Sequence, residues 1–188
     1  MNRREAMTTG ALLTGGAIVG LQAFLSGCKP TAAVAEELFT PEDVAFLDEV
    51  SDTIYPATGS TPGAKEAGVG EFMKTIVTDC YKESDQGIFK AGMTDIRDRC
   101  KAGFGKSFME ISPDQRLELL TAIDGEARAH SESNTDGPEH YFNMMKQLTD
   151  WGYFTSQRGA TEALRYVEIP GYYQGCIPYT EGERAWAL

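Results

Sequence analysis

Apolar residues recur at helical spacing along this chain, and the pattern is strongest over residues 69–80. The apolar positions there fall at i, i+3, i+4, i+7, i+8 and i+11, and they are Val69, Phe72, Met73, Ile76, Val77 and Cys80. Because an α-helix makes one turn in 3.6 residues, these side chains share one face. The segment is therefore predicted to be an amphipathic helix whose apolar face is buried.

Two helix starts are indicated by their capping residues. Thr40 precedes Pro41, and Ser112 precedes Pro113 in a segment that continues with Gln115. A threonine or serine side chain caps a helix by accepting an orphan backbone N–H, and proline fits the first helical position because it lacks that donor. Helices are therefore predicted to begin at these two points.

The remaining pattern completes an all-α prediction. Helices are further expected over residues 85–101, from Tyr141 towards Trp151, and over residues 156–166, and a polar loop is expected over residues 131–136. The positions predicted to face the core are Val44, Leu47, Val50, Ile54, Phe89, Met93, Ile96, Cys100, Leu117, Leu120, Ile123, Tyr141, Phe142, Met145 and Leu148. No segment alternates apolar and polar residues for long, so no sheet is predicted. Residues 40–188 should form a compact, bundle-like domain of five or six helices.

The C-terminal segment is unusually aromatic and is predicted to be extended. From Ile169 onward, Pro170, Gly171, Gly175 and Pro178 interrupt any regular element. Residues 150–188 hold 8 of the 19 aromatic residues, namely Trp151, Tyr153, Phe154, Tyr166, Tyr172, Tyr173, Tyr179 and Trp186. Tyrosine and tryptophan combine a large contact area with a polar group, which suits interfaces. These residues are candidates for docking a partner, with residues 168–188 as a docking tail, although a tail that wraps its own helices would also explain them.

The composition and motifs indicate neither nucleic-acid binding nor catalysis. The net charge is −11 and the basic residues are scattered singly, whereas a phosphate backbone requires clustered Lys and Arg. The Gly103–Ser107 segment lacks the first glycine of a phosphate-binding loop, because Cys100 occupies that position. His130 and His140 flank a polar stretch and lack the spacing of a metal or haem motif. No catalytic, cofactor-binding or metal-binding residue is predicted in this chain.

The N-terminal segment is predicted to be an export signal that ends at a lipidation site. Residues 1–27 place Arg3 and Arg4 before a short, glycine-rich apolar run, which resembles a twin-arginine signal; a basic segment for the general export route is the alternative. Leu25-Ser26-Gly27-Cys28 matches a bacterial lipobox, which implies cleavage before Cys28 and lipid on its sulfur. Residues 28–39 would then be a lipidated tether. We expect an exported lipoprotein that faces the periplasm, with the choice between inner and outer membrane left open.

The cysteine count predicts a disulfide that involves the tail. With Cys28 lipidated, Cys80, Cys100 and Cys176 remain in an oxidising compartment, and their odd number leaves one unpaired. Cys80 and Cys100 are expected near the C-terminal ends of consecutive antiparallel helices, too far apart for a bridge. Cys176 is therefore the expected partner, either of one of these two or of a cysteine on another chain.

Several segments, in order, resemble one protein family. They are Leu38-Phe39-Thr40-Pro41-Glu42, Ile54-Tyr55-Pro56, Pro62-Gly63-Ala64-Lys65-Glu66-Ala67-Gly68-Val69, Tyr153-Phe154-Thr155-Ser156 and Gly159-Ala160-Thr161-Glu162-Ala163-Leu164. On these segments the chain is similar to the gluconate 2-dehydrogenase subunit 3 family. The resemblance covers most of the chain after the signal, and none of its motifs is catalytic.

The resemblance implies an accessory role. It implies a non-catalytic small subunit that exports, anchors and stabilises a large flavoprotein of the glucose-methanol-choline oxidoreductase type. That partner would hold FAD and oxidise a sugar, a sugar acid or an alcohol, and a cytochrome c subunit is the implied electron acceptor. The alternative hypothesis is a free-standing lipoprotein that binds a small molecule or acts as a hydrolase, and a deep pocket with convergent polar groups would favour it.

Overall fold

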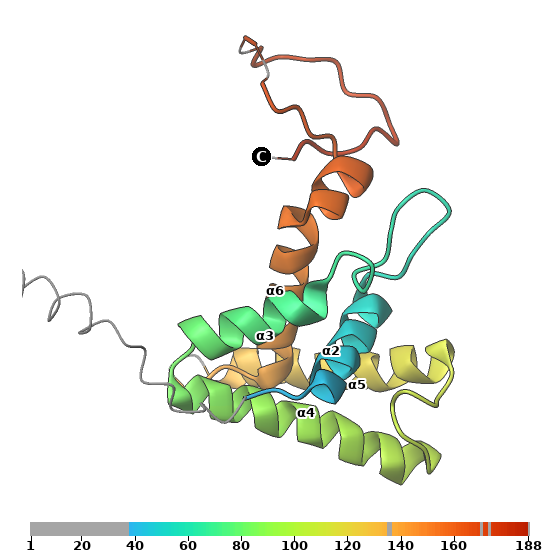
Figure 1. The fold of residues 1–188 in the computed structure, drawn as a ribbon, viewed down its shortest axis with the longest axis vertical. Coiled ribbons are helices and arrows are strands. Elements are labelled where there is room, and N and C mark those ends of the chain that lie inside the picture. The colour runs from blue at the N-terminus through green and yellow to red at the C-terminus, as the bar shows by residue number, and fades with distance from the viewer. Residues whose placement is uncertain (1–37, 135–136, 170, 173, 188) are drawn as a thin grey trace, which may run out of the picture. The chain divides into compact units, whose positions relative to one another are not determined.

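The computed structural model describes residues 38–134, 137–169, 171–172 and 174–187, and residues 38–188 form one compact unit. This part of the chain is helical, with α2 (Pro41–Ile54), α3 (Val69–Cys80), α4 (Glu83–Phe104), α5 (Pro113–Ser133), α6 (Tyr141–Thr155) and the short π-helix η1 (Gly159–Ala163) (Figure 1). The described residues contain no β-strand, which confirms the all-α prediction. The export signal, the lipobox and most of the tether lie outside the described residues.

Both predicted helix starts are capped, and each cap is a complete capping box. The Thr40 hydroxyl accepts the N–H of Asp43 at 3.2 Å, and the Asp43 carboxylate accepts the N–H of Thr40 at 3.0 Å. At α5 the Ser112 hydroxyl accepts the N–H of Gln115 at 3.3 Å, and the Gln115 side chain accepts the N–H of Ser112 at 3.0 Å. Each box satisfies backbone donors that the first turn of a helix leaves unpaired. These local bonds explain why both starts could be predicted from the sequence.

Helix ends differ from the predictions more than helix starts do. Helix α4 continues to Phe104 and stops where Gly105 adopts a left-handed conformation (φ +67°), which favours glycine. Helix α5 runs through Ser133, so the loop expected over residues 131–136 begins later than predicted. The sixth predicted helix is reduced to η1, because the chain becomes extended at Leu164. The predicted sixth helix is therefore present, but it is a π-helix and is shorter than the predicted range of residues 156–166.

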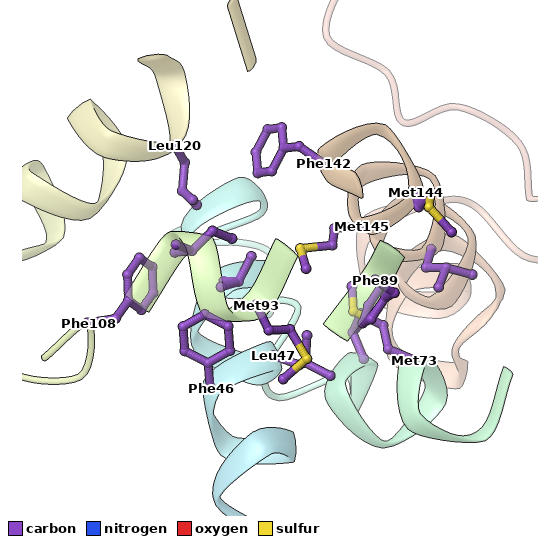
Figure 2. Packing of buried hydrophobic residues seen from close by; sticks show 14 of the residues in the cluster. Phe46, Leu47, Met73, Phe89, Met93, Phe108, Leu120, Phe142, Met144 and Met145 are labelled. Atoms are coloured by element: carbon purple, nitrogen blue, oxygen red, sulfur yellow. The ribbon is translucent and has the colours of Figure 1, made fainter. Parts of the chain in front are cut away.

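The core lies where α2, α3, α4 and α6 meet, and α5 closes it through Leu120 and Ile123 (Figure 2). The apolar face predicted for α4 is buried throughout, and Figure 2 shows Phe89 and Met93 of this face near Met73 and Met145. Burial of such side chains stabilises the fold by roughly 1.5–3 kcal/mol each. The described core is therefore built from the helical stripes that the sequence predicts.

Leu117 of α5 and Cys80 of α3 were predicted to face the core but are exposed, and the predicted apolar face of α3 is only partly buried. Leu117 of α5 is 55% exposed, because the turn that buries Leu120 points Leu117 towards a surface groove beside Thr53. On α3, Val69, Met73 and Val77 are buried, but Phe72 and Ile76 are only partly covered and Cys80 is exposed. The apolar stripe of α3 is thus wider than the surface available to cover it.

No helix in the described part of the chain is both long enough and apolar enough to cross a bilayer.

Candidate partner-docking surface

Helix α6 carries two large aromatic side chains on its exposed face. Trp151 is 53% exposed and Phe154 is 37% exposed, and their spacing of three places them on neighbouring turns. The Trp151 ring packs edge-on against Phe72 with centroids 5.7 Å apart, and Phe154 packs in the same way against Tyr55 at 5.4 Å. Each ring is thus held by a neighbour on one side and open on the other.

Tyr153 lies between these two residues but belongs to the core, which corrects its prediction as a docking residue. It is 4% exposed and stacks on Tyr55 with centroids 5.1 Å apart. Its hydroxyl donates a hydrogen bond to the carbonyl of Pro62 at 2.8 Å. Burial and the neighbouring Asp150 raise the pKa of Tyr55 to about 12, so this aromatic cluster stays neutral at physiological pH. Tyr153 thus supports the exposed rings and is itself too buried to contact a partner.

Residues 165–187 form a loop whose two ends meet, and we call this segment the C-terminal loop. The N–H of Arg165 donates to the carbonyl of Ala185 at 2.8 Å, and the N–H of Ala187 donates to the carbonyl of Arg165 at 3.0 Å. These bonds pair Arg165 with Trp186 as an isolated parallel bridge. Figure 1 follows the loop out from η1 and back towards it. The aromatic tail predicted from the sequence is therefore a closed loop.

Side chains reinforce this closure. The Arg165 guanidinium lies over the Trp186 ring, 3.7 Å from its centroid, and forms an ion pair with Glu183. Arg184 donates to the carbonyl of Glu162 at 2.7 Å, at the end of η1. The Nε of Arg165 is buried and has no hydrogen-bond partner among the described residues. The guanidinium is therefore held by stacking and by its other nitrogens.

The outer part of the loop exposes most of its apolar side chains. Ile169, Tyr172 and Tyr179 are each about four-fifths exposed. Tyr166, Val167, Ile177 and Trp186 are about half exposed. A tail that wrapped its own helices would bury these groups, so the self-wrapping interpretation does not hold for the described residues of the loop. Tyr173, also predicted as a docking residue, lies outside the described residues. A large exposed apolar patch of this kind is typical of interaction sites.

The docking surface, comprising Trp151, Phe154 and the C-terminal loop, is acidic rather than basic. Between Arg165 and Arg184 the loop carries Glu168 and Glu181 near its outer part and no lysine or arginine. Both carboxylates are exposed. A surface of aromatic side chains with scattered carboxylates is suited to binding another protein. The described residues also include no cluster of His, Cys, Asp and Glu side chains that could hold a metal ion.

The two histidines lie together at the junction of α5 and α6. Their ring centroids are 5.6 Å apart. The Nδ1 of His140 accepts the N–H of Phe142 at 3.2 Å, so His140 caps the start of α6. Burial and the nearby His130 lower the pKa of His140. In the structure, His140 thus has a definite role in a helix start.

The described cysteines are free thiols, so no intrachain disulfide joins Cys176 to Cys80 or Cys100. Cys100 is buried and donates from its thiol to the carbonyl of Lys106 at 3.3 Å. Burial raises the pKa of this thiol, which keeps it protonated. Cys80 and Cys176 are exposed. The intrachain pairing was therefore wrong, because a helix buries one thiol and the loop carries another away; a bond from Cys176 to another chain stays a prediction.

A hollow between α2 and α4 bears on the small-molecule hypothesis. It measures about 380 Å³, and Phe46 and Phe108 form part of its wall. One cation of the lining, Arg97, is already paired: its guanidinium forms an ion pair with Asp43 at 2.7 Å and lies 4.4 Å from the centroid of the Phe46 ring. Glu42, Lys101 and Ser107 also line the hollow, so charged and polar side chains border it together with the two aromatic rings.

The closure of the loop was not predicted from the sequence. Arg165 and Glu183 are separated by 18 positions, and neither belongs to a recognisable motif. Only the aromatic content and the Pro and Gly breaks indicated an unusual segment. Which residues join its ends depends on the path of the chain between them.

The comparisons with known proteins agree with the segments identified in the sequence. The family model described as gluconate 2-dehydrogenase subunit 3 matches residues 41–171. The match includes all the helices and the first part of the C-terminal loop. Searches of curated proteins and of solved structures gave no significant match.

Proposed function

Because the chain belongs to the gluconate 2-dehydrogenase subunit 3 family, we propose that it is the non-catalytic small subunit that exports, anchors and stabilises a flavin dehydrogenase. The partner is a large subunit of the glucose-methanol-choline oxidoreductase type that holds FAD and oxidises a sugar, a sugar acid or an alcohol. Its electrons pass to an acceptor, for which a cytochrome c subunit is the proposed candidate. The small subunit supplies binding and position, whereas the chemistry belongs to the partner's flavin.

The observation that carries this proposal is the exposed aromatic surface. Tyr172 and Tyr179 are about four-fifths exposed, and Trp151 is half exposed on a rigid helix. Aromatic side chains that are open on one face and supported on the other are the residue types that dominate binding energy at protein interfaces. In the hollow between α2 and α4, Arg97 is already paired with Asp43, which leaves its guanidinium less available to a small ligand.

The proposed location is the periplasmic face of a membrane. It rests on the sequence of residues 1–28, in which Arg3 and Arg4 begin an export signal and Cys28 ends a lipobox. Several acyl chains on one cysteine would hold the complex firmly at a bilayer. Metabolic labelling with a fatty acid should mark the wild-type chain and leave Cys28→Ala unlabelled. Equal labelling of both would exclude this anchor.

Co-purification tests the partnership directly. The chain is extracted gently from membranes together with the flavoprotein subunit, and the flavin absorbance of the eluate is measured. We expect a yellow companion with the full chain and its loss after truncation behind Val167, because the truncation removes Tyr172, Tyr179 and Trp186, which are half of the exposed aromatic residues that the structure describes. Far-UV circular dichroism should show that the helices persist, since they end before the cut.

A matched control separates loss of the surface from loss of chain length. The double substitution Tyr172→Ser/Tyr179→Ser keeps the loop but removes two of its most exposed rings. It should weaken co-elution, whereas Leu117→Ser, which alters an exposed apolar residue on α5, should not. Unchanged co-elution of the truncated chain would refute a docking role for the C-terminal loop.

A further inference from the structure

We propose that Arg165 and Trp186, with Glu183 and Arg184, form a clamp that holds the C-terminal loop in its docking shape before the partner arrives. Arg165 and Trp186 are thus positioning residues for assembly of the complex. The inference rests on the proposed function, which supplies the partner, but the clamp itself is defined by contacts within this chain.

The clamp begins with the backbone. Two hydrogen bonds, of 2.8 and 3.0 Å, join Arg165 to Ala185 and Ala187 on the returning segment of the loop. This pairing is an isolated bridge, so no sheet extends it or shields it. A single bridge between exposed segments is marginal in water. Its persistence therefore depends on the side chains around it.

Two arginines supply that support from opposite ends of the loop. Arg165, at the start, stacks on Trp186 at 3.7 Å and pairs with Glu183, and both partners lie on the returning segment. Arg184, on the returning segment, reaches back to the carbonyls of Glu162 at 2.7 Å and Thr161 at 3.3 Å. Those carbonyls belong to η1, and the last carbonyls of a helix lack partners within it. The start of the loop is thus bound to its returning segment, and the returning segment is bound to η1.

The clamp matters because the segment it closes has little other internal support. The described residues between 166 and 182 contain no helix, and the backbone hydrogen bond found among them is the turn bond from the N–H of Glu183 to the carbonyl of Thr180. Ordering such a segment at an interface costs binding free energy, and closing its ends in advance removes part of that cost. Without the clamp, the same aromatic residues would lie on a disordered tail. The clamp should therefore raise affinity without any of its charged groups contacting the partner.

The test compares clamp variants in the purified full-length subunit. Arg165→Gln removes the guanidinium that stacks on Trp186 and pairs with Glu183. Trp186→Leu removes the ring on which that guanidinium stacks. We expect each variant to bind the flavoprotein subunit about tenfold or more weakly, because a flexible loop must be ordered on binding. Arg158→Gln is the matched control, since Arg158 also forms an ion pair, with Glu66 at 2.6 Å, but lies outside the clamp. It should bind within about twofold of wild type, because exposed ion pairs contribute little.

A second measurement needs no partner. Limited proteolysis of the free subunit should cleave the loop faster in Arg165→Gln and Trp186→Leu than in wild type or Arg158→Gln, while the thermal unfolding of the helices stays unchanged. Trp186→Phe retains an aromatic face and should keep most of the wild-type affinity for the flavoprotein subunit and most of the wild-type resistance to cleavage. Equal cleavage rates for all of these chains would overturn the clamp.

A double-mutant cycle separates positioning from direct contact, because Trp186 is itself half exposed. If Trp186 acts through the clamp, Trp186→Leu should weaken binding little further once Arg165→Gln is present. If the two losses multiply, Trp186 contacts the partner directly and the inference fails. Truncation behind Val167 distinguishes failure of the clamp from failure of the proposed function. Loss of the partner on truncation with wild-type binding by Arg165→Gln would refute the clamp alone, whereas retention of the partner on truncation would refute the proposed function.

Discussion

Neighbouring residues of α6 show how sharply burial divides similar side chains. Trp151 and Phe154 present rings to solvent, whereas Tyr153 is 4% exposed and donates a hydrogen bond to Pro62. Successive residues on a helix are separated by about 100°, so a run of aromatic residues must spread over several faces. The residue type alone therefore could not separate a core ring from a docking ring.

Tyr153→Phe should destabilise the fold through one lost hydrogen bond. The substitution leaves the carbonyl of Pro62 buried without its donor, and we expect a loss of about 1–2 kcal/mol in the free energy of unfolding. Urea denaturation measures the change. Tyr179→Phe is the control, because it removes the hydroxyl of a residue that is 82% exposed. It should change the free energy of unfolding by less than about 0.5 kcal/mol. Equal effects would contradict the core role of Tyr153.

His140 should make stability depend on pH. In the unfolded chain its imidazole titrates near its ordinary value of 6.5, whereas burial and His130 lower its pKa in the folded protein. Arg99 on α4 acts in the same direction, and Glu126 on α5 and Asp95 on α4 oppose it. As the pH falls below 6.5, protons bind preferentially to the unfolded chain, so stability present above this pH is lost as the pH falls through the folded pKa.

His140→Asn tests this dependence because asparagine keeps a capping oxygen but does not titrate. Thermal unfolding is measured between about pH 7.5 and 5.5, the range in which a histidine changes charge. The midpoint of the wild type should fall more steeply than that of the variant. Parallel curves would show that His140 does not contribute the dependence.

At the scale of elements, helix starts depend on local bonds and helix contacts depend on shape. The two capping boxes need only residues within one turn, and both helices begin where the sequence predicts. The contact between α4 and α6 instead depends on Gly92, where an added Cβ would lie 2.2 Å from Cγ of Tyr141. Tyr141 also donates to Asp95 of α4 at 2.6 Å, which fixes its ring in that position. Here a missing side chain on one helix makes room for a ring on another.

Gly92→Ala should therefore destabilise the packing of α4 on α6. We expect a loss of about 1–3 kcal/mol, because the held ring cannot move aside without strain. Gly87→Ala on the same helix is the control, since a Cβ there would meet nothing within 4 Å. It should raise stability by up to about 1 kcal/mol through helix propensity. Denaturant unfolding of both variants measures the difference, and effects of the same sign would contradict the close contact.

For the whole molecule, a helical body carries an exposed loop whose outer part is aromatic and acidic. The family places the chain in a gluconate 2-dehydrogenase complex, and the net charge of −11 makes association sensitive to the charge of its partner. Between its two arginines the loop carries three carboxylates, of which Glu183 pairs with Arg165, whereas Glu168 and Glu181 have no part in the closure of the loop. The surface that receives the loop should therefore be apolar with basic residues at its edge.

Glu168→Gln/Glu181→Gln should slow association with the flavoprotein subunit at low ionic strength. The difference from wild type should shrink as salt rises, because screening weakens attraction between exposed charges. Glu118→Gln/Glu132→Gln removes the same charge from the exposed face of α5 and serves as the control. Association rates at several salt concentrations measure the effect. An equal change in both double variants would reflect net charge rather than the loop.

The sequence by itself determined the helical class, the capped starts of α2 and α5, the apolar face of α4 and the family, because each depends on residues close together in the chain or on segments in order. Only the tertiary structure decided that Leu117 faces solvent, that Tyr153 belongs to the core, that Cys100 stays a free thiol, and that Arg165 meets Trp186 to close the loop. Those outcomes depend on which surfaces meet in space, and no periodic pattern encodes the meeting of residues so far apart in sequence.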